Sequence, residues 1–168
     1  MALIIEDGSQ VANSNSYSTR ADYIAYALSL GIVIADAVAA DDQLVAAAVF
    51  IGSKENGLKG YRVDRDQSIA FPRTGLVIEG FAWLSTEIPR QLLLAQMSLA
   101  LDLNAGEDLY NLSQSASTGL KSERVEGAVT VEYANADSMK LSRRSASNAL
   151  LASLMRNGGL FSVPVSLG

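Results

Sequence analysis

The segment from Arg90 to Asn104 places the strongest constraint on what this chain folds into. Leucine, alanine and methionine fill most of its positions, so apolar side chains would cover nearly the whole circumference of a helix. A helix of this kind is stable only when other elements surround it, so we expect it at the centre of the core. Pro89 suits the start of this helix and Gly106 suits its end. The sequence therefore predicts a mainly α fold, a small helical bundle built around this segment.

Two helices are expected before the central one. Thr19 and Asp22 have the spacing of a capping box, and apolar residues recur at helical spacing over the next two turns, where they should face the core. A second helix should begin at the Asp41-Asp42 pair, because carboxylates favour a helix N-terminus, and should end near Ser53. Together these two segments predict a helical hairpin.

Extended structure is expected in three places. Residues 120–133 alternate with a period of two, which predicts a β-hairpin with Glu126-Gly127 as its turn. A shorter turn or hairpin is expected around Glu79-Gly80, within residues 76–84. Residues 54–74 lose all periodicity, and we expect a long ordered loop there.

The two ends of the chain are expected to be extended arms. Leu3 to Ile5 reads as a short strand or arm, and a last short helix should be capped by Ser147 or Asn148 and end at Gly158-Gly159. The tail from residue 159 to residue 168 should be extended. No boundary divides the chain, so we expect a single domain over residues 1–168.

Composition removes several classes of chemistry. The chain has 168 residues with no cysteine and no histidine. It therefore has no disulfide framework, no thiolate nucleophile and no imidazole base or metal ligand. We expect no enzyme activity and no cofactor. The net charge of -5 opposes bulk binding of a polyanion, and no apolar run is long enough to predict a membrane span.

Two near-matches to ligand-binding motifs fail at the residues that bind the ligand. Gly52 and Gly57 have the spacing of a phosphate-binding loop, but Leu58 stands where the lysine is needed. The oxygen-rich run that begins at Asp64 opens like a calcium loop, but Ile69 replaces the required glycine. Neither motif predicts a site.

One segment concentrates positive charge in this acidic chain. Its cations are interleaved with Tyr61 and Phe71, a composition typical of a surface that follows a nucleic-acid backbone, although a salt-bridged loop fits equally well. A second, smaller basic cluster contains Arg143 and Arg144 and could contact a neighbouring subunit or DNA. The candidate DNA-facing residues are Lys54, Lys59, Arg62 and Arg65.

Five short motifs follow one another along the chain: residues 4–8 and 12–17 with Asp22 and Tyr26 of the following helix, residues 70–75, Ile88-Pro89, residues 121–125 and residues 129–133. Taken in this order, they resemble one family of small tailed-bacteriophage proteins. Its members are often labelled DnaT-like single-stranded-DNA-binding proteins and are similar to head-tail connectors, also called adaptors or head-completion proteins.

The resemblance implies a structural virion protein rather than an enzyme. Such a protein would form a homo-oligomeric ring, commonly of twelve copies, below the portal in the neck of the virion, after synthesis in the host cytoplasm. The ring would extend the channel for the packaged double-stranded DNA, help retain that DNA and dock the tail. Its implied partners are the portal protein, tail or neck proteins and further copies of itself, without a membrane.

The resemblance also places the contacts. We expect the tail 159–168 to dock on the portal or a neighbouring subunit, and the hairpin 120–133 to contact adjacent protomers or the tail. The candidate contact residues are Leu160, Phe161, Val163, Pro164, Val165, Arg143 and Arg144. Two alternatives stay open: a phage replication protein that binds single-stranded DNA through the basic segment, and a small cytoplasmic enzyme or scaffold unrelated to phage.

Overall fold

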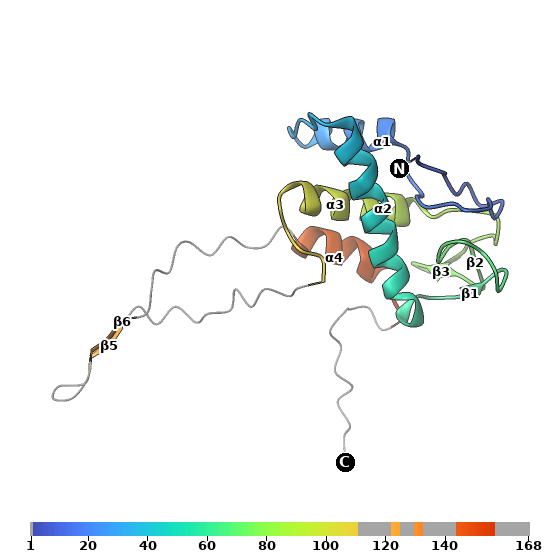
Figure 1. The fold of residues 1–168 in the computed structure, drawn as a ribbon. Helices are drawn as coiled ribbons and strands as arrows, with labels where there is room; N and C mark the ends of the chain where they lie inside the picture. The colour runs from blue at the N-terminus through green and yellow to red at the C-terminus, as the bar shows by residue number, and fades with distance from the viewer. Residues whose placement is uncertain (1, 111–121, 125–129, 133–143, 157–168) are drawn as a thin grey trace, which may run out of the picture.

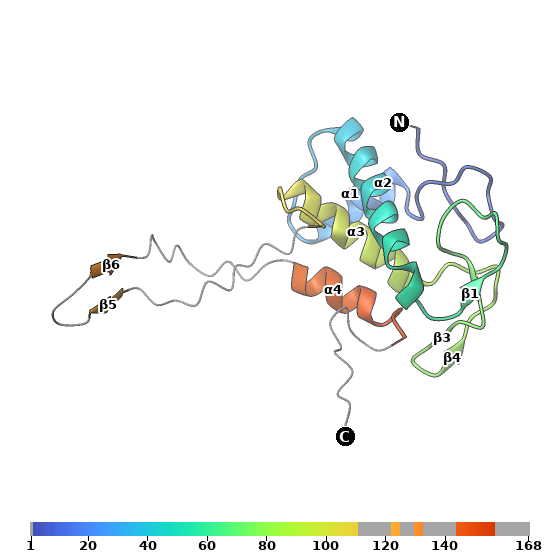
Figure 2. The same cartoon turned by 60° about the horizontal axis from the view of Figure 1, so that its bottom comes forward.

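The computed structural model describes residues 2–110, 122–124, 130–132 and 144–156 (Figure 1). These residues form four α-helices: α1 (Arg20–Ser29), α2 (Ala37–Ser53), α3 (Arg90–Asn104) and α4 (Arg144–Ala152). Helix α3 packs against α2 and against α4, and α1 packs against α2 and α3 (Figures 1 and 2). The predicted mainly α fold built around residues 90–104 is confirmed.

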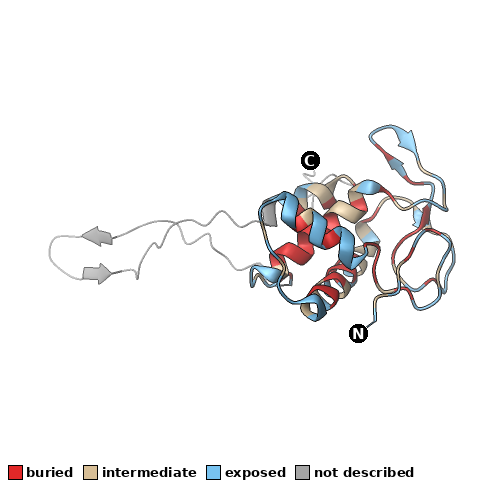
Figure 3. Ribbon diagram, turned by 90° about the horizontal axis from the view of Figure 1, so that it is seen from above, coloured by how far each residue is buried: buried red, intermediate tan, exposed pale blue. Residues whose placement is uncertain are grey.

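Helix α3 is the centre of the core, as its sequence indicates. Its buried residues form an almost continuous run from Leu92 to Asp102, and they include the polar Gln96. Figure 3 shows that buried positions gather where the helices face one another. Pro89 lies at the N-cap position and Gly106 lies two residues beyond the helix end.

Helix α1 begins as predicted but faces the core along a narrower line. The Thr19 side chain accepts a hydrogen bond from the Asp22 N–H, which is the expected cap. Within α1 only Tyr23 and Ala27 are buried, whereas Leu28 is exposed. The expectation that all its apolar residues face the core was wrong, because α1 lies at the edge of the bundle and packs on one side only.

Helix α2 begins earlier than predicted. Its N-cap is Asp36, whose carboxylate accepts the N–H groups of Val38 and Ala39. Asp41, the predicted start, lies in the second turn and forms an ion pair with Arg20 of α1. The prediction missed the start because Asp36 and the Asp41-Asp42 pair both suit a helix N-terminus. Asp36 comes first along the chain and accepts the first free N–H groups.

The segment 54–74 is more regular than a loop. A short 3-10 helix, η1 (Glu55–Gly57), follows α2, and strand β1 (Tyr61–Arg62) pairs antiparallel with β2 (Arg73–Thr74). The prediction of a loop without elements was wrong at these points, because strands of two residues leave no periodicity to detect.

The hairpin around Glu79-Gly80 is confirmed. Strand β3 (Val77–Ile78) pairs antiparallel with β4 (Phe81–Ala82). Glu79 and Gly80 both have positive φ, at 52° and 84°, which is the backbone of a tight two-residue turn between strands.

The later elements agree with the prediction in kind. Strand β5 (Ser122–Arg124) pairs antiparallel with β6 (Thr130–Glu132), which confirms the β-hairpin; its turn at 126–127 lies outside the described residues. Helix α4 begins at Arg144, so the prediction of Ser147 or Asn148 as its cap was wrong. Ser147 lies inside the helix, where its buried hydroxyl donates to Asp102 Oδ2 over 2.5 Å. The helix ends at Ala152, so the predicted end at Gly158-Gly159 was wrong. The tail 159–168 lies outside the described residues.

Candidate nucleic-acid interface

The basic segment is organised around one acidic side chain, Glu55 of η1. Arg62 of β1 forms a bidentate ion pair with it, with Nη2 of Arg62 2.8 Å from Oε2 of Glu55. The same guanidinium donates to the carbonyl oxygen of Gln67 over 2.8 Å. Hydrogen bonding from Arg62 holds the pKa of Glu55 below its ordinary value, and Glu55 in turn raises the pKa of Arg62. Arg62 is therefore committed to internal contacts.

Arg73 lies beneath this ion pair and is almost fully buried. Its guanidinium donates to the carbonyl oxygens of Lys59, Gly60 and Ala70 at 2.8, 3.0 and 3.2 Å. It also lies 3.4 Å from Glu55. Burial lowers the pKa of Arg73, with the attraction of Glu55 acting in the opposite direction. This side chain closes the segment into an ordered unit and is not available to a ligand.

Lys59 and Lys54 also have partners within the fold. Nζ of Lys59 donates to the carbonyl oxygen of Ser153, just beyond α4, over 2.8 Å. Nζ of Lys54 lies 5.1 Å from the centre of the Phe50 ring, in a cation–π contact. Three of the four candidate cations, Lys54, Lys59 and Arg62, thus have partners within the fold, and of these three Arg62 is the one in an ion pair.

Arg65 is the most exposed of the four, with 91% of its side chain accessible. Its Nε lies 3.2 Å from Oδ1 of the neighbouring Asp66, which is itself exposed. An ion pair between two exposed side chains contributes little to stability and opens at small cost, so Arg65 could reach a phosphate.

One cation and one aromatic ring complete this surface. Tyr61 is 68% exposed, and the Arg156 guanidinium lies 5.2 Å from the centre of its ring. Arg156 also donates to the carbonyl oxygens of Leu58 and Gly60. Sequence reasoning missed Arg156 because it lies 98 residues from Leu58 along the chain. An exposed ring beside arginine is a suitable surface for a stacked base.

The first two of the five motifs, within residues 4–17 and 70–75, stabilise the fold. Glu6 is buried, and its carboxylate accepts the N–H groups of Gly8 and Gln10 and the hydroxyl of Ser14. The hydroxyl of Tyr17 accepts the N–H of Phe71 over 3.2 Å, and the two rings meet edge to face with centres 6.1 Å apart. Burial raises the pKa of Tyr17.

A buried glutamine joins residues 16–18 to the central helix. Oε1 of Gln96 accepts the N–H groups of Tyr17 and Ser18 at 3.0 and 2.9 Å. Its Nε2 donates to Ser16 Oγ and to the carbonyl oxygen of Leu44 at 2.8 and 2.9 Å. We call this group the Gln96 hub. It connects the N-terminal segment to both α2 and α3.

Comparison with known protein families assigns the chain. The sequence model of the family described as "Putative DnaT-like ssDNA binding protein" matches residues 1–168. The chain belongs to this family. No curated protein and no solved structure matches it. The resemblance drawn from the five motifs is confirmed as far as the DnaT-like family; the family description does not mention a head-tail connector.

Among the described residues of this DnaT-like protein, no group of three or more acidic side chains could hold a metal ion. Their helices are also too short or too polar to cross a membrane. The candidate portal or subunit contacts remain predictions. Arg143 and the candidate residues of the tail lie outside the described residues, and Arg144 is described only as the first residue of α4.

Proposed function

We propose that this protein is a non-enzymatic structural component of a tailed-phage virion, a head-tail connector that assembles as a ring below the portal. The observation that carries the proposal is the exposure of apolar side chains at two separate places. The first, the corner surface, surrounds the connection between α1 and α2; the second, the hairpin surface, lies on β3–β4 and just after it. The corner surface consists of Leu28, Leu30, Val33 and Val38, and the hairpin surface of Val77, Phe81 and Leu84.

Exposed apolar side chains that gather at one place are typical of contacts between proteins. The α1–α2 connection and the β3–β4 hairpin lie on opposite sides of the part of the molecule formed by residues 2–110 (Figures 1 and 2). Unlike surfaces on opposite sides suit a head-to-tail contact, which closes into a ring when the rotation between copies allows it.

The charges also favour a structural role near DNA. Arg62 and Arg73 of the basic segment are committed to Glu55, and the whole chain has a net charge of -5. A protein of this charge does not hold phosphates strongly, which suits a channel through which packaged DNA must slide. In this proposal the portal, the tail or neck proteins and further copies of the chain are the partners, and the virion neck is the location.

A second candidate function is binding of single-stranded DNA in replication, and the family description favours it more directly than the connector. The residues that would serve it are Tyr61 as a stacking surface, with the adjacent Arg156 and the exposed Arg65 along the backbone of the strand. The number of cations is small, so we expect weak binding with a modest salt dependence, because the salt dependence grows with the number of phosphates that are neutralised.

Two measurements on the full chain separate these functions. If the protein is a connector, light scattering of the chain alone and of its mixture with the portal protein of the same phage should show assembly. Fluorescence titration with an oligonucleotide at low and moderate salt should then show negligible affinity. A monomer that ignores the portal and binds the oligonucleotide would replace the connector with the DNA-binding function.

A matched pair of variants identifies the DNA-binding surface if binding is seen. Tyr61→Ala should weaken binding at the proposed surface, since a stacked base contributes about 1–3 kcal/mol. Tyr110→Ala removes a ring of similar exposure, 62%, from a different part of the chain and should leave binding unchanged. Equal effects of the two variants would exclude this surface.

A further inference from the structure

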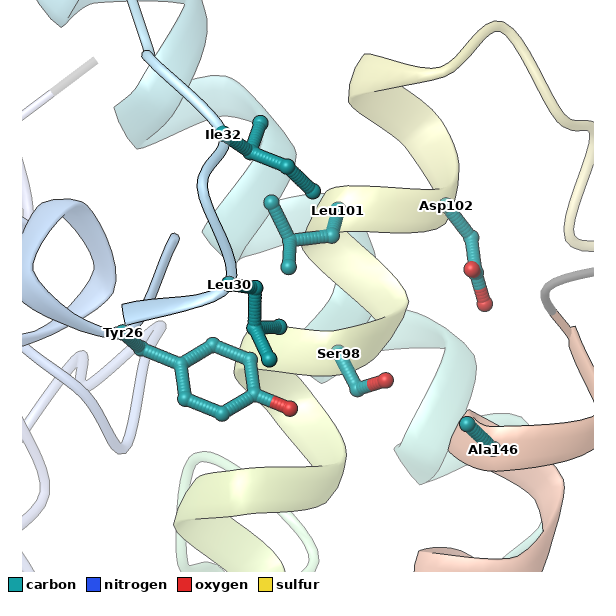
Figure 4. A pocket seen from close by; sticks show the side chains of 7 residues that line it. All are labelled: Tyr26, Leu30, Ile32, Ser98, Leu101, Asp102 and Ala146. Atoms are coloured by element: carbon teal, nitrogen blue, oxygen red, sulfur yellow. The ribbon is translucent and has the colours of Figure 1, made fainter. Parts of the chain in front are cut away.

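A pocket opens beside the corner surface, between α1, α3 and α4 (Figure 4). Its volume is about 320 Å³. The side chains of Tyr26, Leu30, Ile32 and Leu101 form apolar walls, and Ser98 and Asp102 supply polar atoms from α3. Leu30 belongs to both the pocket wall and the corner surface, so the hollow is continuous with exposed apolar side chains.

The opposite side of the molecule presents a protruding ring. Phe81 is 73% exposed and directly follows the Glu79-Gly80 turn. A two-residue turn between paired strands is short and defined, so the backbone at Phe81 lies on a hairpin rather than on a long loop. Aromatic side chains of this kind are the usual anchors of protein interfaces, where they fill a pocket of the partner.

The chain segments that carry the two features are poor in charge, and the one carboxylate among the described residues that line the pocket, Asp102, already accepts a hydrogen bond from Ser147. Residues 28–38 contain one charged side chain, Asp36, which is occupied as the N-cap of α2. Residues 76–86 also contain one, Glu79, at the turn itself. Contact between the two segments therefore buries apolar side chains and leaves few charges to desolvate.

We infer that copies of this chain associate head to tail, with Phe81 of one copy inserted into the pocket beside Leu30 of the next. The inference rests on the proposed ring and specifies its contact. The two features differ in shape, so a ring does not complement a ring and a pocket does not complement a pocket; the ring of one copy complements the pocket of another. Each copy in the assembly thus inserts its ring into one neighbour and receives the ring of the other neighbour in its pocket.

Two single variants test this contact through light scattering of the full chain over a range of concentrations. Phe81→Glu removes the inserted ring, and Leu30→Glu places a charge at the pocket mouth. Both positions are exposed, the second at 55%, so both variants should fold, which circular dichroism verifies. Each should weaken self-association by about 30-fold or more, the effect of losing an interface hot spot. Val49→Glu makes the same change at a 58% exposed valine in the later part of α2 and should assemble as the wild type does.

Mixing the two deficient variants gives the decisive result. Phe81→Glu retains an intact pocket and Leu30→Glu retains an intact ring, so an equimolar mixture should form one-to-one dimers and nothing larger. A symmetric interface that uses one of the two features would instead leave the variant that retains it dimeric by itself, and a symmetric dimer with two reciprocal insertions would give a wild type that never exceeds a dimer.

Several outcomes would overturn the inference. They are a wild type that stays monomeric at every concentration, a Phe81→Glu variant that assembles normally, or a mixture that forms no dimer. A Leu30→Glu variant that is less stable but assembles normally would mean that the chain's own residues fill the pocket. If the wild type and Phe81→Glu both assemble on the portal, the connector function stands and only this contact fails. If the wild type neither self-associates nor binds the portal, both fail.

Discussion

Replacing Gln96 by leucine should destabilise the protein far more than its modest change in size suggests. Gln96 is fully buried, and its side-chain amide makes four hydrogen bonds with the N-terminal segment and α2. Leucine has a similar volume and fills the space, but it can neither accept nor donate. The substitution therefore isolates the hydrogen bonds of the Gln96 hub from its packing.

The expected loss of stability follows from the hydrogen-bonding groups that lose Gln96 as a partner. Ser16 keeps a second hydrogen bond, from its hydroxyl to the carbonyl oxygen of Ser18. The N–H groups of Tyr17 and Ser18 lose the acceptor that Gln96 provides. An unsatisfied buried donor costs about 1–3 kcal/mol, so the two together predict a loss of about 2–6 kcal/mol in the free energy of unfolding. For a chain of this length that is a fall of roughly 5–20 °C in Tm.

Urea unfolding followed by circular dichroism measures this loss, and Gln91→Leu provides the matched control. Gln91 lies on the same helix, and its Oε1 is buried without a hydrogen-bond partner among the described residues. The same substitution there removes an unsatisfied polar atom and should change stability by less than about 1 kcal/mol. If Gln96→Leu costs no more than Gln91→Leu, the Gln96 hub does not hold the N-terminal segment in place.

Two further predictions concern stability. Because Arg62 holds the pKa of Glu55 below 4.5, the ionised carboxylate stabilises the fold above that pH, and this stabilisation is lost as the pH falls through the folded-state pKa. Glu55→Gln should remove this part of the acid dependence in urea titrations between about pH 7 and 3, and an unchanged profile would refute the prediction. Gly8→Ala should lower Tm by at least about 4 °C, since Gly8 has a φ of +104° and a Cβ there would lie 2.0 Å from the Thr86 carbonyl oxygen. Gly52→Ala, with open space around the Cβ, should not lower Tm, and equal Tm values of the two variants in a thermal scan would contradict the prediction.

The helical part of the fold could be predicted because its signals are local. The leucine-rich run of α3, the cap at Thr19 and the Glu79-Gly80 turn each determine the structure of their own neighbourhood. Where two local signals competed, as Asp36 and Asp41 did for the start of α2, the sequence alone did not choose. Asp41 instead meets Arg20 of another helix, a contact that spacing along the chain does not show.

The basic segment illustrates what sequence could not reach. The cluster of cations could be seen, but its meaning depends on which of them face Glu55. Tertiary pairing commits Arg62 and Arg73 to the fold, and brings Arg156 from near the C-terminal end to Tyr61. A charge count treats all these arginines alike. Only the packing separates the cations that support the segment from Arg65, which extends into solvent.

The Gln96 hub has a consequence for the order in which the molecule can be completed during synthesis. Tyr17 is synthesised before Gln96, and the amide oxygen of Gln96 that accepts a hydrogen bond from the Tyr17 N–H is made 79 residues later. At typical elongation rates of about 5–20 residues per second, that interval lasts roughly 4–16 s. During this time Tyr17 and Ser18 have no α3 on which to dock. The growing chain therefore exposes this segment until the central helix has formed.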